Sequence, residues 1–161
     1  MKGITLLGLL IALTSITSFS QSADQTFNEN NYSKISQGKD PESGTYFQQL
    51  YIHKQDTARQ LRMLYADSSF SQLVLKKYEK SNIAEGPFFV YHKGNLVVKG
   101  ENKGGALHGE RTTYQNGTVV QQAFFDSGKK KGTWQGFLPD GKLKRKVIYD
   151  NNENISSVQE Y

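Results

Sequence analysis

One short pattern occurs three times in this chain and restricts the possible folds more than any other feature. Each copy begins with a glycine, carries an aromatic residue five positions later and soon reaches a second glycine. The leading glycines, Gly86, Gly109 and Gly132, are spaced by 23 residues. A fixed period of about 20–50 residues is typical of repeat proteins. The pattern therefore predicts the shape of the protein and argues against catalysis, but it names no ligand.

The second glycine of each copy indicates a β-hairpin. It stands in Lys93-Gly94, Asn116-Gly117 and Asp140-Gly141, between an aromatic-containing run and an apolar run. Tight hairpin turns need positive φ, which glycine adopts at little cost. Two positions past these glycines come apolar residues that begin the second strand: Leu96, Val119 and Leu143.

The last copy shows the alternation expected of a half-buried strand. Counting every second residue places one set on one face: Leu143, Arg145, Val147 and Tyr149. Three lysines fall on the other face: Lys142, Lys144 and Lys146. Such alternation fits an antiparallel sheet with one buried side. This copy also has one extra residue before its second glycine, and we expect a β-bulge at Gly136 or Pro139 to absorb it.

We therefore expect an all-β fold, an antiparallel meander of consecutive β-hairpin repeats in an extended, twisted, single-layer sheet. The three repeats are residues 86–108, 109–131 and 132–153, followed by a C-terminal tail over 154–161. Residues 45–85 contain no glycine and form an N-terminal β-segment that caps the repeats. Within it, residues 56–62 fit a short helix or a strand, and periodicity leaves both open.

The N-terminus has the layout of a secretory signal peptide. A lysine precedes an apolar run, and small residues follow, so residues 1–20 form a signal helix with cleavage near Ser20–Gln21. We expect a periplasmic or secreted protein that is not an integral membrane protein, since no second apolar run is long enough to span a bilayer. Residues 21–44 are polar and predict a flexible lead-in, although Phe27 or Tyr32 docked on the sheet edge is the alternative.

Nothing in the sequence indicates an active site, a metal site or a cofactor. The chain has no cysteine, which excludes thiol catalysis and disulfides. Its three histidines, at positions 53, 92 and 108, lack metal-ligand spacing. The carboxylates are scattered and mostly lie at expected turns, where aspartate caps the backbone. We therefore predict that the protein is not an enzyme.

Basic residues cluster near the end of a chain whose net charge is +5. Lys129, Lys130 and Lys131 lie in an expected turn, ahead of the three lysines of the last strand. Behind a signal peptide, this cluster points to anionic envelope lipid or polysaccharide rather than nucleic acid. The alternative is that lysines on an edge strand only prevent aggregation between sheets.

The repeat resembles the MORN-repeat variant found in exported bacterial proteins, some of which are labelled YwqK-family antitoxins. The copy that fits best runs from Gly132 through Trp134, Phe137 and Asp140 to Leu143. The resemblance covers residues 86–150 and implies a twisted sheet of successive hairpins. Gly100 and Asn102 depart from the later copies, which carry Ala123 or Val147 and Phe125 or Tyr149 there. We expect a less well packed edge at the first copy.

We predict an exported protein–protein interaction module or scaffold that binds through an exposed sheet face. The binding residues would be an aromatic row and the lysines of the last repeat: Tyr91, Tyr114, Trp134, Phe137, Lys142, Lys144 and Lys146. One alternative is an antitoxin or immunity protein that neutralises a partner toxin. The other is a binder of anionic lipid or polysaccharide.

Overall fold

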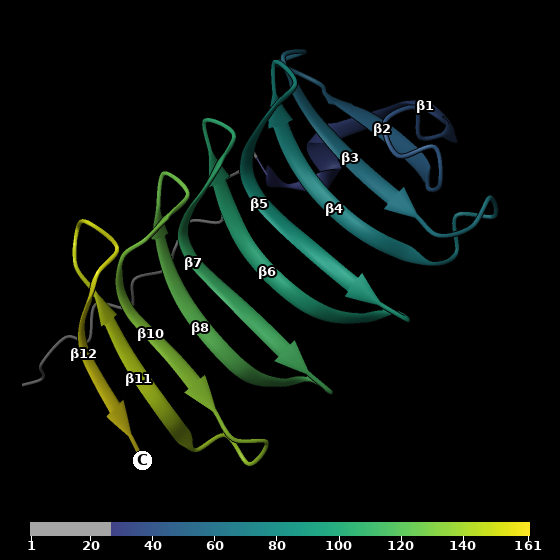
Figure 1. Ribbon diagram of the computed structural model, residues 1–161. Coiled ribbons are helices and arrows are strands. Elements are labelled where there is room, and N and C mark those ends of the chain that lie inside the picture. Colours follow the sequence, from purple (N-terminus) through teal and green to yellow (C-terminus); the bar gives the residue numbers. More distant parts are fainter. Residues whose placement is uncertain (1–26) are drawn as a thin grey trace, which may run out of the picture.

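The twelve strands of the described residues form a single antiparallel sheet in which sequence order is also spatial order (Figure 1). The computed structural model describes residues 27–161, so the predicted signal peptide and residues 21–26 lie outside the described part. β1 and β12 form the two open edges of this sheet. The expected all-β meander is confirmed, and all substantial contacts between strands join sheet neighbours.

Residues before the repeats contribute a 3-10 turn and four strands: η2 (Glu29–Asn31), β1 (Tyr32–Lys39), β2 (Phe47–His53), β3 (Arg59–Tyr65) and β4 (Leu73–Lys80). The repeats contribute seven strands: β5 (Ile83–His92), β6 (Asn95–Lys103), β7 (Ala106–Gln115), β8 (Thr118–Asp126), β9 (Lys129–Lys130), β10 (Gly132–Phe137) and β11 (Leu143–Tyr149). The last strand is β12 (Ile155–Glu160), and the short β9 pairs only with β8.

Two segments differ from the sequence-based expectation, and a third settles a choice that the sequence left open. Residues 27–44, expected to be flexible, contain η2 and β1, because Tyr32 is buried and anchors an otherwise polar strand. Residues 56–62 form no helix: Asp56 caps a turn, and cross-strand partners on both sides hold β3 extended. The expected tail contains β12, which pairs with β11.

The largest buried cluster lies where the N-terminal residues pack on the sheet. Tyr32, Leu61 and Tyr78 are buried together, and Phe27, Tyr51 and Met63 pack around them. The Tyr78 hydroxyl donates to the Phe27 carbonyl at 2.6 Å, and the two rings meet edge to face. The Phe27 ring occupies the space over Gly86, whose φ is +105°, so a side chain at Gly86 would overlap it. The first repeat glycine therefore makes room for the lead-in.

Two of the three repeat turns are the tight hairpins that the sequence predicts. Lys93-Gly94 and Asn116-Gly117 are two-residue turns with positive φ at both positions. The third turn is longer, and in it Leu138 N–H donates to the Lys142 carbonyl and Gly141 adopts a φ of +84°. The extra residue of the third copy is thus accommodated in the turn that contains Pro139.

A register shift occurs at the equivalent place in all three repeats. It lies beside Tyr91 in the first copy, Tyr114 in the second and Phe137 in the third. In each copy the second strand carries one residue without a register partner: Val97, Val120 and Lys144. The shift beside Gly136 is therefore a property of the repeat and does not absorb the extra residue of the third copy.

The first repeat is not an edge of the sheet. Its strands β5 and β6 lie between β4 and β7. The Phe88 ring covers Gly100 so closely that a methyl group there would need the ring to move. An aromatic residue across the pair thus fills the space that a larger side chain fills in the later copies.

Candidate functional site

Cross-strand register shows which residues share each face of the sheet. In an antiparallel pair, residues directly opposite each other point to the same side. One unbroken row of opposite residues runs from β3 to β12: Leu64, Leu75, Val90, Val98, Thr113, Gln121, Gly136, Arg145 and Glu160. Trp134 lies two residues before Gly136 and shares this side, which we call the tryptophan face.

Apolar residues beside its row, which include Trp134, Val147 and Val158, make the tryptophan face the more apolar side, and the other side, the opposite face, carries a row that is equally polar at its C-terminal end. This row continues from Met63, Lys76 and Phe89 into polar residues: Lys99, Thr112, Gln122, Gln135, Lys146 and Gln159. A sheet with one polar and one apolar face normally packs its apolar face on another layer. Among the described residues the sheet is the only layer, so the tryptophan face has no such cover.

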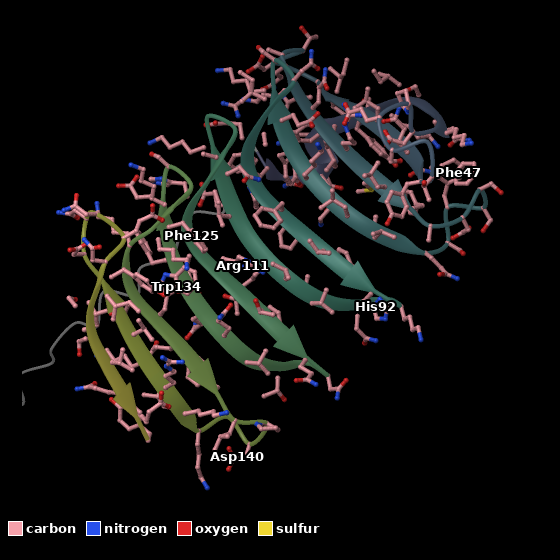
Figure 2. All side chains as sticks on the ribbon, viewed as in Figure 1. Phe47, His92, Arg111, Phe125, Trp134 and Asp140 are labelled. Carbon is pink, nitrogen blue, oxygen red and sulfur yellow. The ribbon has the colours of Figure 1, made fainter. Side chains whose placement is uncertain are left out.

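Three aromatic rings from β8, β10 and β11 form a patch on the tryptophan face, here called the aromatic patch: Phe125, Trp134 and Tyr149. The Trp134 ring lies 5.0 Å from that of Phe125 and 5.2 Å from that of Tyr149. Phe125 is buried, whereas Trp134 and Tyr149 remain partly exposed. Figure 2 shows Arg111, Phe125 and Trp134 over neighbouring strands, away from the turns that His92 and Asp140 mark.

Two further contacts fix the orientation of the Trp134 ring. Its indole Nε1–H donates to the Phe124 carbonyl at 3.0 Å. The Lys130 ammonium lies 5.2 Å from the centroid of the Trp134 ring and 5.3 Å from that of Tyr149. Both separations are within the range of a cation–π interaction. Lys130, in β9, therefore lies over the aromatic patch and helps to hold the Trp134 and Tyr149 rings in place.

Next to the aromatic patch the surface has a shallow hollow of about 270 Å³. Gly136 lies in its wall, and an added Cβ there would meet no atom within 4 Å. Arg145 lines the same hollow and pairs with Glu160 at 3.0 Å. Its remaining walls include Gln121, Trp134, Val147 and Tyr149. The hollow thus combines apolar walls with polar groups, as ligand-binding surfaces usually do.

The aromatic row predicted from the sequence is divided between the two faces. Tyr91, Tyr114 and Phe137 occupy equivalent positions beside the register shifts, opposite Leu96, Val119 and Leu143. Each follows a residue of the tryptophan face directly and so points to the opposite face, where the Lys99 ammonium lies 6.0 Å from the Tyr114 ring. The structure separates Trp134 from these residues and brings it together with Phe125 and Tyr149.

The three predicted lysines do not form one row either. Lys142 lies in the turn and pairs with Asp140 at 3.1 Å. Lys144 is the extra residue of the register shift, and Lys146 lies opposite Gln135. The shift between Leu143 and Arg145 breaks the strict alternation that the sequence suggested. Arg145, Val147 and Tyr149 do share the tryptophan face, as expected.

A nearly buried charge cluster lies at the N-terminal end of the tryptophan face. The Arg62 guanidinium contacts Glu79 at 3.3 Å and lies 3.8 Å from Asp40. Lys77 pairs with Glu79 at 2.7 Å. Burial raises the pKa of Asp40, but hydrogen bonds from Ser43 and the charges of Arg62 and Lys77 outweigh it and leave that pKa below its usual value. These charges compensate one another, which suits a structural role.

The described residues contain neither a metal-binding group nor a long apolar helix. Over residues 27–161, no three His, Asp or Glu side chains come close enough to hold a metal ion. His53 packs edge to face on Tyr32, and its Nδ1 accepts backbone N–H groups of Gln55 and Asp56. In the same range, no helix is long and apolar enough to cross a membrane.

Comparison with known proteins yields distant structural similarity and no match in sequence. No protein-family model matches the chain, and no curated protein matches it in sequence. In the crystal structure of the pneumococcal O-GlcNAc transferase GtfA in complex with UDP and GlcNAc, a region aligns with a TM-score of 0.41 and 13% identity. The alignment covers 63% of this chain and 19% of the transferase chain. The resemblance to the MORN-repeat variant therefore stays a prediction.

Proposed function

We propose that this chain is an exported, non-enzymatic interaction module that binds a partner protein through the aromatic patch and its hollow. One observation carries the proposal: the more apolar side of the sheet bears partly exposed aromatic rings, and no second layer formed by residues 27–161 covers it. Aromatic side chains are enriched in protein interfaces because they provide a large apolar contact with a polar tip.

The geometry favours this site over the lysines and over the tyrosines of the opposite face. Lys142 is paired with Asp140 and Lys131 with Asp126 at 3.0 Å, so part of the basic charge is neutralised within the chain. The aromatic patch, in contrast, is held in place by Lys130 and by the Trp134 hydrogen bond. Side chains that are already ordered lose little entropy on binding.

The test is a pull-down with two variants of β10. Gly136→Arg directs a long side chain into the hollow from a position where the added Cβ meets no atom within 4 Å, so it should leave the fold intact. Thr133→Arg places the same side chain on the opposite face of the same strand, opposite Ile148. The mature chain, residues 21–161, and Thr133→Arg should capture the same protein from a lysate of the source cells. Gly136→Arg should lose it, while circular dichroism stays unchanged.

The salt concentration of the pull-down separates the alternatives. A protein held by apolar contacts stays bound at high salt, whereas an anionic lipid or polysaccharide held by lysines elutes as salt screens the charges. A toxin partner would be retained at one-to-one stoichiometry and would itself be toxic when expressed alone. Capture by Gly136→Arg at the wild-type level would refute the aromatic patch as the site.

A further inference from the structure

β12 is an open edge of the sheet, and past a register shift at Ser156 its residues Ser157 to Glu160 pair with β11 without interruption. It pairs with β11 on one side only. Its sequence, Ile155 to Glu160, contains no lysine, proline or glycine. Of the large apolar side chains that are exposed in the described residues, three lie here or at the next position: Ile155 at 57%, Val158 at 45% and Tyr161 at 67%.

The other open edge, β1, carries features that discourage pairing with another strand. β1 carries Lys34 and Lys39, a glycine at position 38, and a register shift at Ile35. Charged residues and bulges are the devices by which natural sheets prevent pairing at an edge. β1 thus carries two lysines and a shift within the strand, whereas β12 has no lysine and its shift lies at Ser156, outside the stretch from Ser157 to Glu160, which favours pairing at β12.

The hydrogen bonds of β12 show which of its backbone groups are available. The Tyr161 N–H donates to the Lys144 carbonyl at 2.9 Å. Hydrogen-bonded pairs alternate along an antiparallel ladder, and Arg145–Glu160 and Val147–Val158 are the intervening pairs. Val158 and Glu160 therefore direct both their N–H and their carbonyl groups away from β11, toward the open side.

We propose that two copies of this chain pair through β12, antiparallel and about a two-fold axis, into one continuous sheet. If Gln159 faces Gln159 of the second copy, the outward groups of Val158 meet those of Glu160 in the other chain. The outward N–H groups of Val158 and Glu160 then each have an acceptor, and their outward carbonyls each have a donor. A two-fold contact of this kind closes on itself and stops at the dimer.

Side chains support the same arrangement. Val158 lies opposite Val147 on the tryptophan face, so the second copy continues this face across the junction, with its Glu160 beside Val158. Glu160 is already paired with Arg145 at 3.0 Å, which reduces repulsion between the two acidic residues. The two-fold axis is perpendicular to the sheet, so the dimer presents both aromatic patches on one side. The proposal does not depend on a partner binding there.

Val158→Pro tests the pairing without disturbing the β11–β12 ladder. The Val158 N–H points outward, so proline removes a donor that only a second copy would use, and edge strands tolerate proline at such positions. Val158→Ala is the matched control, because it shortens the same side chain and keeps the N–H. In sedimentation velocity over a concentration series, wild type and Val158→Ala should shift from monomer to dimer, and Val158→Pro should stay monomeric.

Hydrogen exchange gives a direct second measurement. In the wild type the amides of Val158 and Glu160 should exchange more slowly at concentrations where the dimer forms, whereas β1 amides should not respond. A wild type that stays monomeric over the series, or a Val158→Pro dimer of unchanged affinity, overturns the proposal. Species larger than a dimer also overturn it, because they need a second edge. If the Val158 amide exchanges slowly only when a captured partner protein is present, the β12 edge binds that protein and not a second copy.

Discussion

Truncation of Leu61 is the sharpest test of how this single-layer sheet is stabilised. Leu61 is the most deeply buried large side chain among the described residues, at 1% exposure, and it packs against Tyr32 and Tyr78. Replacing a buried leucine by alanine costs about 2–5 kcal/mol, depending on how well the neighbours close the cavity. The partly exposed Tyr51 and Met63 can settle into the space. We therefore expect Leu61→Ala to lower the free energy of unfolding by about 3 kcal/mol.

Urea unfolding with two probes measures this loss of stability and shows whether it extends from the N-terminal segment to the repeats. With a slope of about 2 kcal/mol per molar urea, the midpoint should fall by about 1.5 M. Circular dichroism reports on the whole sheet, whereas tryptophan fluorescence reports on Trp134 alone, the one tryptophan of the chain. Isolated hairpins are marginal in water, so the repeats should unfold with the N-terminal segment. Both probes should then give the same shift.

The matched control is Ile83→Ala, which shortens an apolar side chain that is 51% exposed. It should change stability by no more than about 0.5 kcal/mol. If Leu61→Ala shifts the dichroism transition but leaves the Trp134 transition in place, the repeats unfold independently of the N-terminal segment. Joint unfolding would then be refuted. If neither probe moves, Leu61 does not contribute to the core as its burial implies.

Two further predictions concern charges. Arg62→Ala removes the cation beside Asp40 and one of the two cations beside Glu79, which keeps Lys77, and should cost about 3 kcal/mol in urea unfolding. Arg145→Ala, which breaks an exposed pair with Glu160, should cost less than about 1 kcal/mol. The Ser69 hydroxyl and the backbone N–H groups of Ser71 and Gln72 lower the pKa of Asp67 to about 2. Because that pKa is depressed, the stability it gives is present above the ordinary value of 3.8 and is lost as pH falls toward 2. Asp67→Asn should therefore flatten the acid side of a stability–pH curve, and a curve of unchanged slope would contradict this reading.

The sequence predicted the fold because its strongest signals are local. Asn116-Gly117 and Lys93-Gly94 specify tight turns through positive φ at consecutive positions. Repetition every 23 residues then requires successive hairpins to pair in order. Signals of this kind need no knowledge of distant contacts, and the meander from β5 to β11 follows from them.

The faces of the sheet were harder to predict because they depend on pairing. Lys144 looks like an ordinary outward residue until the register shows that it has no partner on β10. β1 and β12 are mostly polar in composition, and their extended conformation depends on pairing with the neighbouring strands β2 and β11. One signal was available in the sequence: Trp134 and Phe137 are an odd number of positions apart, which in a regular strand places them on opposite faces.

The distribution of burial along the sheet explains why a binding surface is expected at the C-terminal end. At the N-terminal end, Phe27 and Tyr32 cover the opposite face, and the charge cluster around Arg62 occupies the tryptophan face. Past β8 no described element covers either side in this way, yet the apolar face continues through Trp134 and Val147 to Val158. The aromatic patch and the open edge strand β12 thus lie at the same end of the molecule. A partner on the patch and a second copy at β12 would together cover the apolar surface that the chain itself leaves exposed.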